Sequence, residues 1–128
     1  MKKILIINAD YYKEITDQIL LRIKRELKKE KVSLSLITVA GIFEIPIAIR
    51  RNIQKFDAFI VIGCAIKGKT PHFDLICKSS FDAIIQLAIT YNKPISNGII
   101  TALNKKQAYE RCGKIKSNKP NKGLEAAK

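Results

Sequence analysis

The sequence is short of several residue types, and each shortage narrows what the protein can be. It has no tryptophan, one histidine and one methionine, and its three cysteines lack the spacing of metal ligands. Aromatic residues amount to 7%, which is sparse for a surface that stacks on RNA bases. No apolar run reaches the roughly 18 residues needed to cross a bilayer. The composition therefore argues against a disulfide-stabilised scaffold, a membrane-spanning protein and a collagen-like fibre.

Acidic residues are also scarce, since 24 Lys and Arg stand against 11 Asp and Glu, a formal net charge of +13. Such an excess suits nucleic acid, an anionic membrane or an anionic small substrate. Most of the basic residues are lysines scattered over polar faces, with local clusters at 22–31 and from 105 onward. This distribution favours solvated faces, and a non-catalytic basic module that binds nucleic acid remains an alternative.

Length and hydropathy predict one globular domain over residues 1–128. Hydrophobic residues make up 47% and charged residues 27%, ordinary proportions for a chain that buries a core. The N-terminal run over 1–7 is basic and then apolar, but Asp10 follows too early for a signal peptide. We therefore expect a cytoplasmic protein.

Apolar residues repeat with a helical period in some segments and a strand pattern in others. We predict strands over residues 2–9, 32–39, 57–64 and 94–101, and helices over 13–31, 44–54, 74–91 and 105–113. Alternating strands and helices indicate an α/β protein, a three-layer α/β/α sandwich around a four-stranded, parallel, doubly wound (flavodoxin-like) sheet. Ligands of such sheets bind outside the carboxyl ends of the strands. These ends lie at residues 9–12, 40–43, 64–72 and 101–103.

One segment at these ends matches the phosphate-binding loop of nucleotide triphosphatases, G-x-x-x-x-G-K-[ST]. It runs from Gly63 to Thr70, between a predicted strand and a predicted helix. Pro71 follows it without an N–H to offer a phosphate, and the strand over 94–101 carries no carboxylate for Mg²⁺. A small nucleotide triphosphatase therefore stays an alternative only, although a turn before a helix N-terminus is a good place for an anion.

The strand ends also collect side chains that can do chemistry. His72 is the only histidine, and an imidazole titrates near neutrality, as a proton-transfer group should. Glu44 can accept hydrogen bonds from hydroxyls or complement a helix N-terminus. Arg111 can bind a phosphate or complement a helix C-terminus. Tyr11 and Phe43 can stack on a planar ring or pack at the rim. Together these residues place a base, a phosphate-binding group, an acceptor for hydroxyls and aromatic rings along one edge of the sheet.

Five segments resemble the 6,7-dimethyl-8-ribityllumazine synthase family. Residues 39–46 (VAGIFEIP) are similar to its V-P-G-A-F-E-I-P segment, and residues 63–74, which end in KGKTPHFD, to its G-x-x-I-R-G-x-T-x-H-F-D. Residues 94–101 resemble its fourth strand. Residues 107–113 and 121–127 resemble its E-Q-A-x-x-R-A-G and N-K-G-x-E-A-A. The similarity covers nearly the whole chain in the same order.

The resemblance implies an enzyme and its reaction. 5-Amino-6-(D-ribitylamino)uracil condenses with 3,4-dihydroxy-2-butanone 4-phosphate, releasing phosphate and water, in the penultimate step of riboflavin biosynthesis. No cofactor and no metal are implied, and neither nucleic acid nor membrane is a partner. The family forms homo-oligomers, pentamers with sites between subunits. We expect an isolated pentamer, or a pair of them, rather than an icosahedral shell, because the sequence begins directly at its first strand.

The resemblance also assigns roles to individual residues. His72 becomes the proton-transfer residue, and Tyr11 stacks on the pyrimidine. The phosphate is held by Arg111, with help from Lys69 and Thr70. The other substrate-binding residues are Ile42, Phe43 and Glu44 at the ribityl chain, the backbone of Ala65 and Ile66 at the uracil, Asn97 from a neighbouring subunit, and Lys122 near the site.

Overall fold

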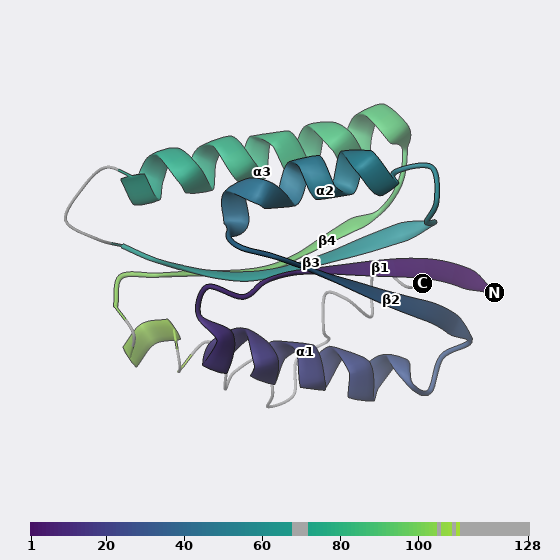
Figure 1. Cartoon of the computed structure of the whole chain (residues 1–128), viewed down its shortest axis with the longest axis horizontal. Helices are drawn as coiled ribbons and strands as arrows, with labels where there is room; N and C mark the ends of the chain where they lie inside the picture. Colours follow the sequence, from purple (N-terminus) through teal and green to yellow (C-terminus); the bar gives the residue numbers. More distant parts are fainter. Residues whose placement is uncertain (68–71, 105, 109, 111–128) are drawn as a thin grey trace.

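A parallel sheet with helices on both faces organises the chain (Figure 1). The computed structural model describes residues 1–67, 72–104, 106–108 and 110. The elements in chain order are β1 (Lys2–Ala9), α1 (Lys13–Leu27), β2 (Val32–Val39), the 3₁₀ turn η1 (Ile42–Glu44), α2 (Ile45–Asn52), β3 (Ala58–Ile66), α3 (His72–Tyr91) and β4 (Ile95–Ala102). All the strand pairs are parallel, in the order β2-β1-β3-β4. The predicted α/β sandwich is therefore confirmed.

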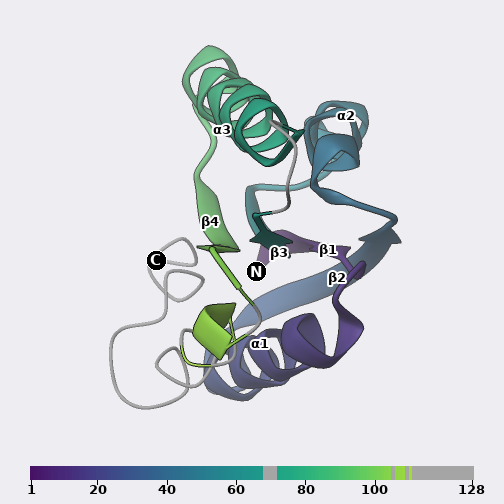
Figure 2. The same cartoon turned by 90° about the vertical axis from the view of Figure 1, so that its left-hand side faces the viewer.

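The strand order reverses direction once, between β1 and β3. From β1 the chain moves outward to β2, then crosses back to β3 on the other side of β1 and continues outward to β4. Helix α1 covers one face of the sheet, and α2 and α3 lie side by side on the other (Figures 1 and 2). A doubly wound sheet binds ligands at such a reversal, outside the carboxyl ends of the two strands.

The core has two halves, one on each face of the central strands. Strands β1 and β3 are rich in β-branched residues and are buried on both faces, as expected for strands covered by helices on both sides. On the α1 face, Ile6 and Ile60 pack with Ile19 of the helix. On the other face, Phe59 packs with Ile49 of α2. Strand β2, at the edge, exposes alternate residues. The central strands are thus held rigidly, which fixes where their carboxyl ends point.

Two helix boundaries differ from the sequence prediction. Helix α1 ends at Leu27, not at residue 31, because residues 28–31 offer no apolar side chain to the core. Helix α3 begins at His72, not at residue 74, so His72 belongs to a helix and not to the preceding loop.

Smaller differences concern single residues. Strand β3 extends to Ile66, two residues beyond the prediction, and α2 is shorter at both ends. Ile85 is 58% exposed, because Ile84 beside it takes the buried position. Asn104 acts as a helix N-cap, since its Oδ1 accepts a hydrogen bond from the Gln107 backbone N–H at 2.9 Å. Within the described ranges, no helix is long and apolar enough to cross a membrane.

Candidate active site

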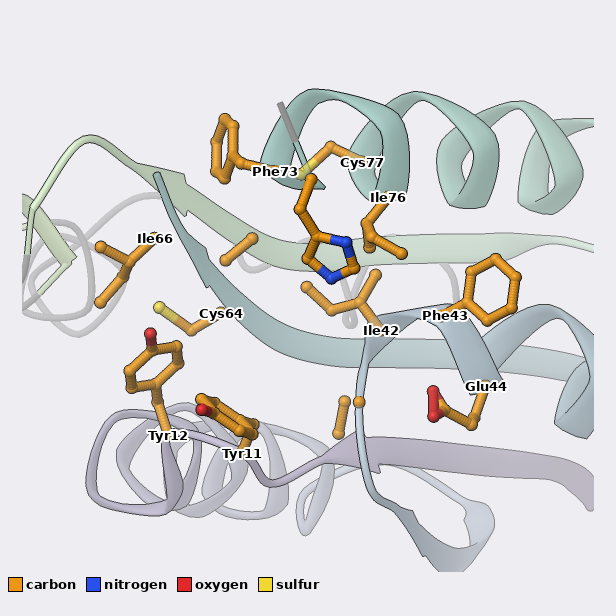
Figure 3. A pocket seen from close by; sticks show the side chains of 14 residues that line it. Tyr11, Tyr12, Ile42, Phe43, Glu44, Cys64, Ile66, Phe73, Ile76 and Cys77 are labelled. Atoms are coloured by element: carbon orange, nitrogen blue, oxygen red, sulfur yellow. The ribbon is translucent and has the colours of Figure 1, made fainter. Parts of the chain in front are cut away.

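A cavity of about 710 Å³ opens where the strand order reverses, at the carboxyl ends of β1 and β3 (Figure 3). Four segments far apart in the sequence line it. They contribute Ala9, Tyr11 and Tyr12 after β1, Gly41, Ile42, Phe43 and Glu44 between β2 and α2, Cys64, Ala65 and Ile66 at the end of β3, and His72, Phe73, Ile76 and Cys77 of α3. The lining is mostly apolar with a few polar groups, which is typical of a small-molecule site.

The wall after β1 is aromatic. Tyr11 is 75% exposed, and its ring centroid lies 4.9 Å from that of Tyr12, with the ring planes at 78°. Tyr12 is the N-cap residue of α1, and its carbonyl accepts hydrogen bonds from the Ile15 and Thr16 N–H groups at 3.0 and 3.1 Å. Because the Tyr11 ring is largely exposed beside the cavity, a planar ligand ring can stack on it.

The wall between β2 and α2 carries a carboxylate. Glu44 precedes α2, but its side chain makes no capping hydrogen bond to that helix. The Glu44 Oε2 atom instead lies over Gly41, 3.4 Å from where a Cβ would stand. No ion pair or hydrogen bond joins this carboxylate to another described residue. The carboxylate is therefore available to accept hydrogen bonds from a ligand.

The position of this wall depends on a glycine in β3. A Cβ at Gly63 would lie 3.1 Å from the Ile42 Cγ1 atom, closer than an ordinary van der Waals contact. Glycine at this position lets η1 approach the sheet, so that Ile42 is buried and Phe43 and Glu44 stand at the cavity rim. The side chains on the rim thus depend on a residue that does not itself line the cavity.

The wall formed by α3 carries the imidazole. His72 is the first residue of α3, and Ile76 follows one turn later, so both lie on the face toward the cavity. Cys77 continues this face and is buried. Burial raises the pKa of the Cys77 thiol, with a smaller contribution from the Asp74 carboxylate. A thiol with a raised pKa stays protonated near neutrality and is a poor nucleophile.

The floor of the cavity is a strand edge. Strand β1 pairs with β3 only as far as Asn8 and Ile62, whereas β3 continues to Ile66. On its other side β3 remains paired with β4, up to Ile66 and Ala102. Beyond Ile62, the side of β3 toward β1 therefore pairs with no strand in the described part of the chain. Its backbone N–H and C=O groups can meet the polar edge of a ligand.

The structure brings most of the predicted site residues together. Those that line the cavity are Tyr11, Ile42, Phe43, Glu44, Ala65, Ile66 and His72. Asn97 does not line it: this residue lies within β4 opposite Val61, and its Oδ1 accepts a hydrogen bond from the Ile99 N–H at 2.9 Å. Four predicted residues, Lys69, Thr70, Arg111 and Lys122, lie outside the described residues.

Sequence reasoning assigned no substrate role to several lining residues. Tyr12 directly follows a predicted site residue, and its position at a strand end was a usable signal. Three further lining residues follow His72 at helical spacing: Phe73, Ile76 and Cys77. Because the sequence predicts a loop at His72, that spacing could not place them on the same helix face. The predicted strand end at 101–103 contributes no side chain to the cavity. In the part of the chain that the structure describes, no three His, Cys, Asp or Glu side chains gather as metal ligands.

The whole chain is similar to one family of known proteins. A family model described as 6,7-dimethyl-8-ribityllumazine synthase matches residues 1–128. A protein of that name from Campylobacter jejuni subsp. jejuni serotype O:23/36 (strain 81-176) is 41% identical over 130 residues, covering 97% of this chain and 82% of the relative. The one from Bartonella bacilliformis is 37% identical over 128 residues, covering 97% and 84%. The one from Corynebacterium kroppenstedtii is 30% identical over 124 residues, covering 97% and 77%.

Proposed function

The chain belongs to the 6,7-dimethyl-8-ribityllumazine synthase family, transferases of riboflavin biosynthesis, and we propose that its cavity is where the two substrates of that reaction meet. The observation that carries the proposal is the convergence on one cavity of an exposed aromatic ring, a carboxylate without a described partner, the carboxyl end of β3 and the only histidine of the sequence. The whole-chain family match leaves the nucleotide triphosphatase and nucleic-acid-binding alternatives without support.

The pyrimidine binds between the tyrosine wall and the strand edge. Tyr11 presents a ring face on which the uracil stacks. The backbone of Ala65 and Ile66, beyond the last pair of β3 with β1, supplies donors and acceptors to the edge of the uracil. Stacking recognises any planar ring, whereas backbone hydrogen bonds recognise the pattern of donors and acceptors on that ring. The two contacts together select the uracil.

The ribityl chain extends along the wall between β2 and α2. The Glu44 carboxylate accepts hydrogen bonds from its hydroxyls, and such charge-assisted bonds are stronger than bonds between neutral groups. Ile42 and Phe43 cover the carbon backbone of the chain. This arrangement explains why Glu44 carries a carboxylate that neither caps α2 nor pairs with a described cation.

His72 transfers protons during the condensation. The 5-amino nitrogen of the pyrimidine adds to the ketone carbon of the butanone phosphate and one water leaves. Phosphate then leaves from the other end, and a proton shift gives a carbonyl carbon there. The second nitrogen adds to this carbon, and a second water leaves as the ring closes. Each step moves a proton, and a positioned general acid–base contributes about 10²–10⁴-fold. Orientation of two bound substrates contributes the larger share of the rate. We assign the phosphate to Arg111, with help from Lys69 and Thr70, and a substrate-binding role to Lys122. No cofactor or metal takes part.

We also propose that the single domain works as a cytoplasmic homopentamer with sites between subunits. Exposed apolar residues support this: Phe43 at the cavity rim, Ile47 of α2, and Leu75, Ile85 and Ile89 of α3 all show more than half of their surface. Such a set of exposed apolar side chains suits contact with another copy. Asn97 then reaches a neighbour's site from β4. Light scattering tests the assembly: we expect five or ten subunits, and a monomer or a shell of about sixty would refute it.

The decisive test mixes the purified protein with both substrates and follows the absorbance of the lumazine product. We expect product and inorganic phosphate to appear in equal amounts, because one phosphate leaves for each ring that closes. Omitting either substrate is the control and should give neither product. Failure of the assembled protein to form lumazine would refute the proposed function.

A further inference from the structure

Two adjacent tyrosines line the wall after β1, and only Tyr11 has a role so far. The two rings form an edge-to-face pair, with centroids 4.9 Å apart and planes at 78° (Figure 3). We propose that Tyr12 is a positioning residue, whose ring holds that of Tyr11 in the orientation that stacks on the pyrimidine. This inference rests on the proposed function, because it needs a planar substrate ring on Tyr11.

The backbone beneath the two rings is already fixed on both sides. The Asp10 N–H donates to the Val39 carbonyl at 3.2 Å, which ties the segment to β2. The Tyr12 carbonyl accepts from two backbone N–H groups of α1, and the Thr16 hydroxyl donates to it at 3.4 Å. What remains free at Tyr11 is therefore the rotation of its side chain, since that side chain is 75% exposed.

The two tyrosines differ in how firmly their side chains are held. Tyr12 is half-buried and packs against the apolar cluster between α1 and the sheet. Figure 3 shows its ring close to Cys64 of β3. Its hydroxyl makes no hydrogen bond to another described residue. The Tyr12 ring is thus held by packing while its hydroxyl has no described partner, and the contact with Tyr11 is made by the ring.

A fixed neighbour changes the cost of binding. An exposed aromatic side chain that rotates freely loses that freedom when a ligand stacks on it, and the loss weakens binding. The edge of one ring against the face of another restricts the rotation before the ligand arrives. Loss of the Tyr12 ring should therefore weaken binding of the pyrimidine, without changing the affinity for the butanone phosphate or the chemical step.

A double-mutant cycle tests this coupling. The dissociation constant of 5-amino-6-(D-ribitylamino)uracil alone is measured by calorimetry for the wild type, Tyr12→Leu, Tyr11→Leu and the double variant. Tyr12→Phe, which keeps the ring and removes the hydroxyl, is the matched control. We expect Tyr12→Leu to weaken binding about threefold to tenfold, as typical aromatic pair energies imply. Tyr12→Phe should stay within twofold, and Tyr12→Leu should have no further effect once Tyr11 is leucine.

Three results would overturn the inference. Tyr12→Leu binds the pyrimidine as tightly as the wild type, Tyr12→Phe loses as much affinity as Tyr12→Leu, or the affinity loss of the double variant is the product of the losses of the two single variants. If Tyr12→Leu unfolds, Tyr12→Met, which keeps an apolar side chain of similar length, takes its place. The Michaelis constant for the butanone phosphate should stay within twofold throughout, whereas a general disturbance of the fold would raise it. If the two substitutions are coupled in pyrimidine binding but the protein forms no lumazine, the proposed function is refuted and the inference is supported. If the protein forms lumazine but the two substitutions weaken binding independently, the inference is refuted and the proposed function is supported.

Discussion

The two ends of the sheet differ in whether their polar groups are hydrogen-bonded within the chain. At the amino end the chain satisfies its own polar groups: the Lys93 ammonium donates hydrogen bonds to the carbonyls of Ile53 and Phe56. Lys3 and Asp57 exchange two more, each 2.8 Å long, between β1 and the start of β3. At the carboxyl end, the cavity contains a carboxylate without a described partner and a strand edge without a partner strand.

This difference separates stability from function along a single sheet. Polar groups that are bonded within the chain stabilise the fold and have nothing left for a ligand. Polar groups that the fold leaves unpaired cost stability and can bind a substrate, because a ligand supplies the missing partner. Variants at the amino end should therefore change unfolding and spare turnover, whereas variants at the carboxyl end should do the opposite.

The largest effect is expected at the carboxyl end, from His72→Ala. Without the imidazole, the proton transfers lose their acid–base group, and kcat should fall about 10²–10⁴-fold. The free energy of unfolding should hardly change, because the side chain is exposed. Lumazine absorbance and urea unfolding measure the two quantities. Lys78→Ala, at an exposed position of the same helix, is the control, and equal activity in both variants would exclude His72 as the proton-transfer residue.

The second effect belongs to the amino end. Lys93→Met removes an ammonium that bonds two carbonyls and keeps most of the aliphatic stem. Hydrogen bonds to charged groups contribute about 1.5–3 kcal/mol each, less where they are partly exposed, so we expect a loss of about 2–3 kcal/mol in urea unfolding. Lys55→Met, at an exposed lysine shortly before β3, should be neutral. A Lys93 variant as stable as the wild type would contradict the separation of the two ends.

Glu44→Gln should have an intermediate effect. The amide keeps the shape of the side chain but removes the charge, so the bonds to the ribityl hydroxyls weaken and the Michaelis constant for the uracil substrate should rise about tenfold. Unfolding should not change, since the carboxylate caps no helix. Glu14→Gln, in the first turn of α1, is the matched control. An unchanged Michaelis constant would remove Glu44 from the ribityl site.

The smallest effect is expected from Gly63→Ala, which changes a residue behind the cavity wall and should affect both stability and turnover. Gly63→Ala places a Cβ 3.1 Å from Ile42 Cγ1, so that η1 must move outward by a few tenths of an ångström. We expect a loss of about 1 kcal/mol in unfolding and a severalfold fall in kcat/KM. Gly41→Ala meets only an ordinary contact at 3.4 Å and should be milder. The reverse ranking would show that the wall position does not depend on Gly63.

Much of the fold could be predicted from local patterns. The buried strands β1 and β3 are continuous apolar runs, and the amphipathic spacing of Ile15, Ile19 and Ile23 identifies the buried face of α1. Helix ends were less accurate, because a helix stops where its packing stops, and packing depends on the partner. Ile84 and Ile85 are equally apolar in the sequence, yet only Ile84 faces the core.

The sequence predicted where in the fold the candidate site lies, but not every residue that lines it. The expectation that ligands bind at carboxyl strand ends correctly brought Tyr11, Glu44 and His72 to one cavity. The contribution of Tyr12 depends on the angle between two rings, and the role of Gly63 depends on how closely η1 approaches β3. Neither quantity is encoded in residue spacing, because both arise from contacts between segments that are folded separately.

By itself, the sequence determined the alternation of strands and helices, the family and the residue types at each strand end, because these follow from local periodicity and from short motifs. Only the tertiary structure decided that β3 continues for four residues, from Gly63 to Ile66, past its last pair with β1. The reason is physical: a strand edge is free or paired according to the register of another strand, and that register is set when the two halves of the core pack on both faces of the sheet.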